Sequence, residues 1–253
     1  MQDAHVIRII GVHKWLGGRP VLSGVDLDVR EGETLAIMGP SGTGKSVLLK
    51  HIVGLFDPDA GDILVDGISV PSADRAEMAA VRTRTAYVFQ NSALFDSMTV
   101  RGNLRMGLPP GFCRGRAAKC EELVRAALDH VNLEPDVLTL LPAELSGGMQ
   151  RRVAIARAII GKRRYVLYDE PTTGLDPVNA TRINRLIARV GEEVDATSIV
   201  VTHDVESAFF LADRIALLSD GVVAAEGTPH ELRETDNRAV REFLDAAPAR
   251  GPA

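Results

Sequence analysis

Residues 34–46 read TLAIMGPSGTGKS, and this segment constrains the fold more than any other part of the chain. The apolar run TLAIM is typical of a short buried strand. The glycine-rich loop after it leads into SVLLKHIVGL, whose apolar residues recur with a helical period at Val47, Leu48, Ile52 and Leu55. A strand, a glycine-rich loop and a helix in this order are the setting of a P-loop. The segment therefore predicts an α/β fold that binds phosphate.

The loop itself fits the pattern G-x-x-x-x-G-K-S/T in full. Glycines let backbone N–H groups approach phosphate oxygens, the lysine amine neutralises the β and γ phosphates, and the serine hydroxyl can ligate Mg²⁺. A glycine-rich turn without a ligand is the alternative, and the flanking strand and helix disfavour it. We predict that the whole loop binds nucleotide: Gly39, Pro40, Ser41, Gly42, Thr43, Gly44, Lys45 and Ser46.

The segment YVLYDE at 165–170 places four apolar residues before two acids. This pattern is typical of a buried strand that ends at the carboxyl edge of a parallel sheet, where ligands bind. We predict that Asp169 holds Mg²⁺ through water and that Glu170 polarises the attacking water. Many strands end in solvated acids, so the pair alone is weak evidence. Here PTTGLDP follows it and adds a third acid, Asp176.

The stretch LSGGMQ at 145–150 precedes a long helical run. A serine and two glycines at a helix N-terminus can hold an anion with unpaired N–H groups and the positive end of the helix dipole. The phosphate-binding loop lies far upstream in the sequence. Either the two segments meet by folding within one chain, or they meet between two chains.

The rest of the chain alternates between strand and helix patterns. VIRIIGV and VDLDV, joined through GGRP, predict an N-terminal pair of strands. Residues 91–161 are mostly helical in pattern, with an apolar stripe at Val124, Leu128 and Val131. TSIVVT predicts another strand, and the Asp-Gly within IALLSDGVVAAEG predicts a hairpin.

Charge and cysteine content limit the function classes. The chain has 253 residues, with 29 basic and 34 acidic side chains and a net charge of −5, which gives no support for a nucleic-acid partner. Cys113 and Cys120 match no zinc spacing, so we expect reduced, inert thiols in a cytoplasmic protein. No apolar run approaches the ~20 residues of a membrane span. A role at a membrane would therefore be exercised from the cytoplasmic side through a partner.

Six motifs in order make the chain resemble the ABC ATPase family over nearly its whole length. GPSGTGKS resembles the Walker A motif, Gln90 in YVFQ the Q-loop, LSGGMQ the signature, YVLYDE the Walker B motif, GLDP at 174–177 the D-loop, and His203 in VVTHD the switch histidine.

The resemblance implies an α/β P-loop NTPase fold with a RecA-like core, an N-terminal antiparallel β-subdomain and an inserted helical subdomain. Residues 1–90 and 162–227 would form the nucleotide-binding core with the β-subdomain. Residues 91–161 would form the helical subdomain that carries the signature, and 228–253 a C-terminal helical tail.

The same resemblance implies hydrolysis of ATP with Mg²⁺. Trp15 falls where the family stacks an aromatic ring on adenine, although burial habits alone would make it a rim residue of the β-subdomain. The implied catalytic residues are Glu170, His203, Lys45 and Gln90, and the implied metal ligands are Ser46, Gln90 and Asp169. Besides the Walker A loop, the implied nucleotide contacts are Trp15, Ser146, Gly147, Gly148 and Asp176.

In this family two cassettes pair head to tail, so the helix after LSGGMQ in one chain faces the γ-phosphate held by Lys45 of the other. The anion sought above would then lie between chains. The single cassette implies a homodimer or pairing with a different cassette, and a membrane permease as a further partner. This arrangement would place the protein at the inner face of the cell membrane.

A finer resemblance concerns the segment after Gln90. ALFDSM within VFQNSALFDSMTVRGNL is similar to the ALFxSM of the ATPases of Mla/Mce lipid-transport systems. It implies transport of phospholipid or a related lipid between membranes of the cell envelope, with an MCE-domain lipid-binding protein and a small STAS-type subunit as partners. The chain departs from the pattern at Asn91-Ser92, where a glycine is expected, and in GNLRMGLPPGFCRG, which lacks the usual apolar-proline pattern.

Two other functions compete with lipid transport. One is the ATPase of another ABC transporter, such as an amino-acid importer. The other is a non-transport ABC protein of DNA repair or translation, disfavoured because the sequence has no long coiled-coil insertion, zinc cysteines or second cassette. The apolar residues Leu94, Phe95 and Met98 would contact the permease in a transporter, or else pack inside the helical subdomain.

Overall fold

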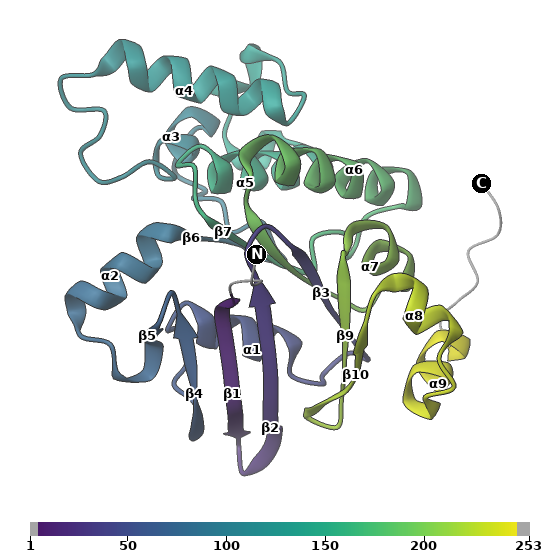
Figure 1. Cartoon of the computed structure of the whole chain (residues 1–253). Coiled ribbons are helices and arrows are strands. Elements are labelled where there is room, and N and C mark those ends of the chain that lie inside the picture. The colour runs from purple at the N-terminus through teal and green to yellow at the C-terminus, as the bar shows by residue number, and fades with distance from the viewer. Residues whose placement is uncertain (1–4, 247–253) are drawn as a thin grey trace. The chain divides into compact units, whose positions relative to one another are not determined.

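The computed structural model describes residues 5–246. Within this range the chain forms two compact units (Figure 1). The first comprises residues 5–82 and 197–246, and the second comprises Thr83–Ala196. Each unit is described by itself.

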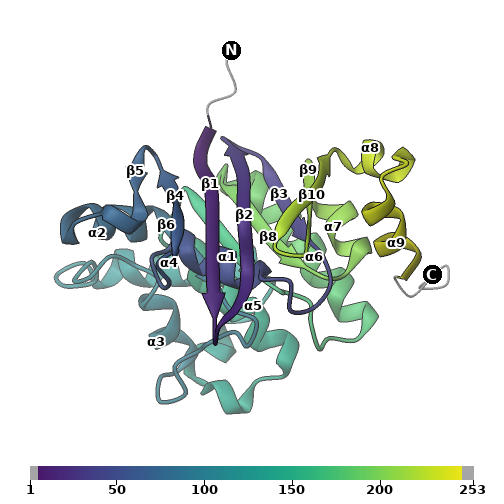
Figure 2. The same ribbon diagram turned by 90° about the horizontal axis from the view of Figure 1, so that it is seen from below.

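An antiparallel sheet begins the first unit. β1 (His5–Leu16) and β2 (Arg19–Arg30) form the long hairpin seen in Figure 2, and β4 (Ala60–Val65) and β5 (Ile68–Ser69) extend it in the order β2-β1-β4-β5. A short 3-10 helix, η1 (Val70–Ser72), follows β5. Buried apolar side chains of β1 and β2 alternate with more exposed positions along much of each strand, as in a sheet with one solvated face. The predicted N-terminal antiparallel β-subdomain is confirmed.

A second group of strands in this unit is mainly parallel. β3 (Thr34–Met38) lies between β8 (Thr197–Thr202) and β9 (Arg214–Ser219) and is parallel to both. β10 (Val222–Gly227) pairs antiparallel with β9 as the second strand of the predicted hairpin. All six residues of β8 are buried, which explains its continuous apolar pattern. The strands predicted at TLAIM and TSIVVT are confirmed.

Helices of the C-terminal region complete a core against β3 and β9. Ala36 and Met38 of β3 and Ile215 and Leu217 of β9 are buried with Ala208, Leu232 and Val240. Figure 1 shows α8 (Pro229–Glu234) and α9 (Arg238–Ala246) beside β9 and β10. The helical tail predicted at 228–253 is therefore represented by two helices that bury apolar side chains, and residues 247–253 lie outside the described range. The helices of this unit are α1 (Lys45–Ile52), α2 (Arg75–Arg84, which extends into the second unit), α7 (Val205–Leu211), α8 (Pro229–Glu234) and α9 (Arg238–Ala246).

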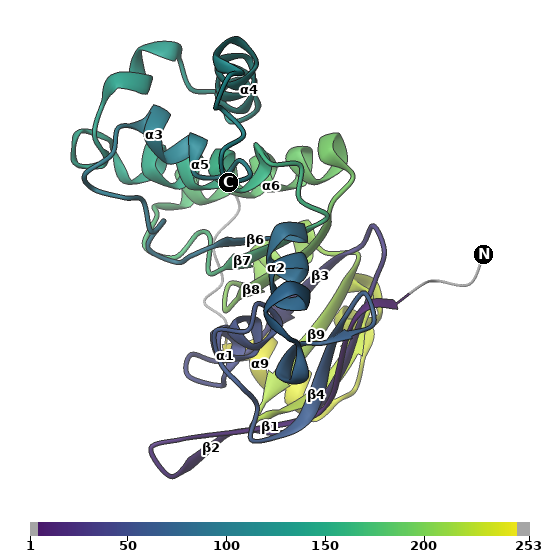
Figure 3. The same ribbon diagram turned by 90° about the vertical axis from the view of Figure 1, so that its left-hand side faces the viewer.

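The second unit combines two parallel strands with four α-helices (Figure 3). Its elements are β6 (Thr85–Val88), α3 (Val100–Arg105), α4 (Ala117–His130), η2 (Pro135–Thr139), η3 (Pro142–Glu144), α5 (Gly147–Ile159), β7 (Tyr165–Asp169) and α6 (Pro177–Val194). The predicted apolar stripe of Val124, Leu128 and Val131 is fully buried. The unit is wider than the helical subdomain predicted at 91–161, because β6 pairs with β7 and α6 packs on α5.

The prediction of reduced cysteines is wrong for this structure. Cys113 and Cys120 form a disulfide. The loop before α4 folds back so that the two Cα atoms lie 5.3 Å apart, within the range that a disulfide spans. Sequence spacing gave no sign of this contact because it depends on the conformation of that loop.

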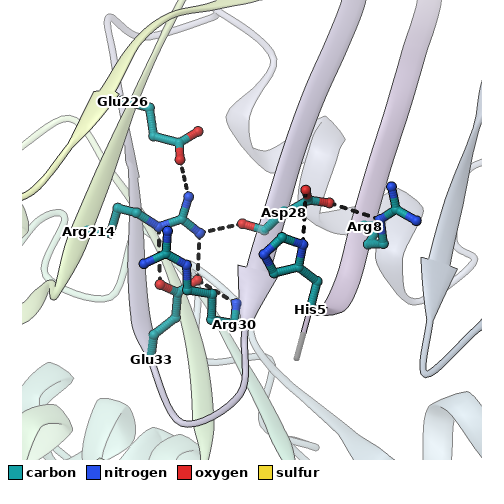
Figure 4. A network of polar contacts seen from close by, with 7 residues as sticks. All are labelled: His5, Arg8, Asp28, Arg30, Glu33, Arg214 and Glu226. Atoms are coloured by element: carbon teal, nitrogen blue, oxygen red, sulfur yellow. Dashed lines mark hydrogen bonds and ion pairs between the residues drawn. The ribbon is translucent and has the colours of Figure 1, made fainter. Parts of the chain in front are cut away.

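A buried arginine ties the two sheets of the first unit together (Figure 4). The guanidinium of Arg214, on β9, donates to both carboxylate oxygens of Glu33, to Glu226 and to the carbonyl oxygen of Asp28 on β2. Glu33 Oε1 also accepts from the Arg30 backbone N–H at 2.6 Å. Burial alone would lower the pKa of Arg214, but the hydrogen bonds and negative charges of the two glutamates raise it. The network is therefore a charged cluster with satisfied donors.

We expect Glu33→Gln to lower the free energy of unfolding by roughly 3–5 kcal/mol, because it leaves a buried cation without its main counter-charge. Arg8→Gln is the control: Arg8 pairs with Asp28 at 3.2 Å, but both side chains are substantially exposed, and such pairs contribute about 0–1 kcal/mol. Denaturant titration of the two variants measures the difference. Equal, small losses would show that the Arg214 network does not stabilise the fold.

Candidate nucleotide site

The predicted phosphate-binding loop connects β3 to α1 in the first unit. Gly42 and Gly44 have φ angles of +85° and +97°, in the left-handed region that favours glycine. Gly44 is the N-cap of α1 and has no side chain that could cap the first turn. The first backbone N–H groups of α1 therefore follow directly on the loop and have no side-chain cap, as in a site that binds an anion.

Two glycines of the loop are required by close packing. A Cβ atom at Gly39 would lie 2.2 Å from the carbonyl oxygen of Leu218, and one at Gly44 would lie 2.8 Å from Leu22 Cδ2. Lys45 is buried, and its Nζ donates to the carbonyl oxygens of Gly39 and Pro40 at 2.8 and 2.9 Å. The amine thus points back into its own loop, where it would meet phosphate oxygens.

Two other predicted residues belong to the first unit. His203 is exposed directly after the end of β8. Trp15 is exposed near the end of β1, and its ring stacks on His13 with centroids 5.7 Å apart. The Trp15 backbone N–H donates to Asp59 Oδ2 at 2.7 Å, and this bond is the main reason why the pKa of Asp59 is lowered. Trp15 is therefore held in place with its indole accessible to solvent.

The two acids at the end of β7 have different surroundings in the second unit. Asp169 Oδ2 accepts from the Tyr87 hydroxyl at 2.9 Å, and burial followed by the Asp169 charge raises the pKa of Tyr87. Glu170 is buried, has a φ of +50° and accepts from the Thr173 hydroxyl at 2.8 Å. A non-glycine residue with positive φ is strained, and such strain concentrates at functional sites. Both carboxylates are thus oriented by hydroxyl groups.

The loop after β6 carries Gln90, which is exposed. Ser92 and Ala93 have φ angles of +60° and +44°. These angles explain why a glycine is expected at this position, since glycine would adopt them without strain. Arg157 on α5 stabilises the loop by donating to the carbonyl oxygens of Ala93 and Ser92 at 2.7 and 3.0 Å. Sequence analysis missed this role of Arg157.

Hydrogen bonds from a single asparagine side chain hold the apolar segment 94–98, which follows this loop. The buried side chain of Asn103 accepts from the Phe95 N–H at 2.8 Å and donates to the carbonyl oxygens of Phe95 and Met98, both at 3.1 Å. Leu94 and Met98 are half-buried, whereas the Phe95 side chain is 46% exposed and lies under the Arg157 guanidinium at 5.8 Å. For Phe95, packing inside the helical subdomain is excluded.

The signature residues form the start of α5, as the sequence predicts. Ser146 is the N-cap, and its hydroxyl accepts from the Met149 N–H at 3.3 Å. Gly147 is exposed and no atom lies within 4 Å of a Cβ built on it, so the helix start is open. One turn on, the buried Arg151 donates to the carbonyl oxygens of Thr173 and Phe89 at 3.0 and 3.4 Å. Arg151 thereby joins the signature helix to the segments that carry Glu170 and Gln90.

The D-loop ends where α6 begins, and the start of α6, like that of α5, is capped by a side chain. Asp176 is the N-cap of α6, and its Oδ1 accepts from the Asn179 N–H at 3.0 Å. The hydrogen bonds from Asn179 lower the pKa of Asp176. The second unit therefore has two helix N-termini capped by side chains, those of Ser146 and Asp176.

These features define a P-loop nucleoside triphosphatase: a glycine loop between a strand and a helix, with its lysine amine turned into the loop, and paired acids at the end of a buried parallel strand. A sequence profile described as ABC transporter matches residues 22–173, and the chain belongs to the ABC transporter family. It is an ABC-type ATPase of a transporter and binds ATP with Mg²⁺.

The chain is similar to ATPases of different transporters. It is 40% identical to the sulfate/thiosulfate import ATP-binding protein CysA of Caulobacter vibrioides, over 92% of this chain and 68% of that protein. It is 38% identical to the intermembrane phospholipid transport system ATP-binding protein MlaF of Haemophilus influenzae, over 90% of this chain and 86% of that protein. Among solved structures, the dimeric post-hydrolysis state of the ATP-binding cassette MJ0796, bound to ADP and Pi, has a TM-score of 0.79 and 34% identity over 88% of this chain and 98% of its own.

Proposed function

We propose that the protein is the ATPase of a transporter that moves phospholipid or a related lipid between membranes of the cell envelope. The observation that carries this proposal is the segment ALFDSM, which is similar to that of lipid-transport ATPases and presents an exposed Phe95 on a rigid loop. The 38% identity to a phospholipid-transport ATPase supports the same substrate class.

The proposed site roles follow the family resemblance. Lys45 and the rest of the Walker A loop bind the phosphates, with Trp15 stacked on adenine. Ser46, Gln90 and Asp169 hold Mg²⁺. Glu170 orients the attacking water, and His203 contacts the γ-phosphate. The buried, strained position of Glu170 and its bond from Thr173 support its role as a fixed base.

We further propose a head-to-tail dimer in which Ser146, Gly147, Gly148 and Asp176 of one chain act on ATP held by the other. The open helix start at Gly147 supports this arrangement because a second chain's phosphate could approach it. The structurally similar cassette MJ0796 is itself dimeric and bound to ADP and Pi. The proposed pair is two copies of this chain.

The proposed complex contains a permease, an MCE-domain lipid-binding protein and a small STAS-type subunit, and no nucleic acid. It places the ATPase on the cytoplasmic side of the inner membrane, attached through the permease. Within residues 5–246, none of the helices has both the length and the apolar character needed to span a bilayer.

Phe95 is the proposed anchor to the permease. We expect Phe95→Ala to leave the melting temperature and basal ATPase rate of the isolated subunit nearly unchanged, because the ring is almost half exposed and its contact with Arg157 contributes only about 0.5–1 kcal/mol. Assembly with the permease, or lipid transport, should fall sharply.

Phe210→Ala is the matched control, since Phe210 is also exposed, at 55%, but lies outside this segment on α7. A large loss of stability in the isolated Phe95→Ala subunit would indicate a core role. Unchanged assembly and transport would refute the coupling role.

A second candidate is the ATPase of a solute importer, favoured by the 40% identity to a sulfate/thiosulfate import ATPase. The two functions differ in what stimulates the complex. We propose purifying the ATPase together with its partner permease and measuring ATP hydrolysis in detergent. Stimulation by added phospholipid with an MCE-domain protein supports lipid transport, whereas stimulation by a periplasmic solute receptor with its solute supports import.

A further inference from the structure

A cavity of about 460 Å³ lies in the second unit and belongs to none of the nucleotide motifs. Side chains of α5 and α6 line it together with residues that follow α4. Its volume is within the ~300–1,000 Å³ typical of small-molecule sites. Its polar walls are mainly four arginines, and we call it the arginine cavity: Arg152, Arg182, Arg185 and Arg189.

Two of these arginines have structural partners. Arg152 Nη1 donates to the carbonyl oxygen of Asn132 at 3.2 Å, and Arg189 donates to the carbonyl oxygen of His130. The His130 carbonyl is the last of α4 and lacks a partner within the helix, and the Asn132 carbonyl follows two residues later, so this end of α4 favours a cation. Glu193 also approaches Arg189, with 3.8 Å between Oε1 and Nε. These contacts fix two guanidinium groups at the cavity wall.

Arg182 and Arg185 are exposed and have no such partners. Within residues 5–246, neither makes a hydrogen bond or an ion pair. They are spaced i, i+3 on α6, and Arg185 and Arg189 are spaced i, i+4, so like charges are neighbours on one helix face. Such pairs destabilise a helix by about 0.2–0.5 kcal/mol each. No acid precedes Glu192 in α6 to compensate them.

The cavity also has an apolar part. Val131 and Leu186 line it and are buried, with exposures of 0% and 6%. Because these two side chains expose almost no surface, a ligand there would contact mainly the arginines. The excess positive charge occurs in a protein whose net charge is −5, so it does not follow from a generally basic surface.

We propose that the arginine cavity binds the phosphate group of a small anionic ligand. Guanidinium groups bind phosphate oxygens through paired, charge-assisted hydrogen bonds, and Arg182 and Arg185 have their donors available for this. The ligand is either a free phosphate compound or the headgroup of an anionic phospholipid, since both offer the same chemistry. The site is independent of the proposed lipid-transport function.

The first experiment uses pyrophosphate as the probe, with the full-length protein saturated by Mg²⁺ and ADP so that the Walker A loop is occupied. Titration calorimetry should detect binding that the double variant Arg182→Gln/Arg185→Gln weakens by about tenfold or more, since two charge-assisted contacts are lost. The matched control is Lys119→Gln/Arg125→Gln. It removes the same charge from α4, where Lys119 and Arg125 already pair with Glu122 and Glu121. The control should bind within about twofold of the unchanged protein.

The second experiment tests the lipid source by flotation with vesicles of phosphatidylcholine, with and without phosphatidylglycerol. Loss of pyrophosphate binding in the Arg182→Gln/Arg185→Gln variant supports a free phosphate ligand. If the Arg182→Gln/Arg185→Gln variant fails to float with vesicles that contain phosphatidylglycerol, while the α4 control still floats, the result supports a lipid headgroup as the ligand. If this variant and the α4 control behave alike in both experiments, the proposal is overturned. Melting curves establish that both variants are folded.

Discussion

Glu170→Gln is expected to bind ATP normally and to hydrolyse it about 10²-fold more slowly or worse, the scale on which a general base contributes. The exchange keeps the shape of the side chain but removes the charge that polarises water. Glu170 is buried, is strained at φ +50° and accepts a hydrogen bond from the Thr173 hydroxyl. Its carboxylate is therefore held in one position, where another group cannot easily take over its role. ATP-bound dimers should accumulate.

Single-turnover hydrolysis and size-exclusion chromatography with ATP measure these two effects. Thr173→Ala should give a smaller loss, of about tenfold, because it removes only the hydrogen bond that orients the carboxylate. Glu134→Gln, at an exposed glutamate of the same unit, should leave the rate unchanged. Near-normal hydrolysis by Glu170→Gln would remove Glu170 from the role of base.

Mixing two inactive variants is expected to restore activity if each site combines two chains. Lys45→Ala should weaken nucleotide binding, because it removes the amine in the phosphate loop. Ser146→Arg should spare ATP binding by the single subunit and block dimer closure, because it places bulk and positive charge at the open start of α5. Random pairing of equal amounts should then give about a quarter of normal activity, since about half of the dimers are mixed and each has one intact site.

Ser146→Ala is the control for this experiment, since it removes the helix cap without adding bulk and should cost only about 1 kcal/mol of stability. Crosslinking establishes how many mixed dimers are present. If demonstrated mixed dimers never exceed the activity of either parent, then either each site lies within one chain or hydrolysis needs both sites at once.

The segment after Gln90 shows where sequence patterns reach their limit. The sequence marks a departure at Asn91-Ser92 but not its consequence, because the left-handed angles of Ser92 and Ala93 are stabilised by Arg157, 65 and 64 residues further along the chain. From the sequence, a partly buried arginine such as Arg157 cannot be told from an ordinary surface residue until its partners are known. The exposure of Phe95 depends in the same way on Asn103, whose side chain holds the loop.

The sequence by itself determined the P-loop, the strands at TLAIM, YVLYD and TSIVVT, the terminal hairpins and the start of the signature helix, and through them the family. These are contiguous runs whose local period or glycine content dictates the backbone. Only the tertiary structure decided the Cys113–Cys120 disulfide, the Arg214 network and the arginine cavity. Their partners are brought together by loop conformation and helix packing, which residue spacing does not encode.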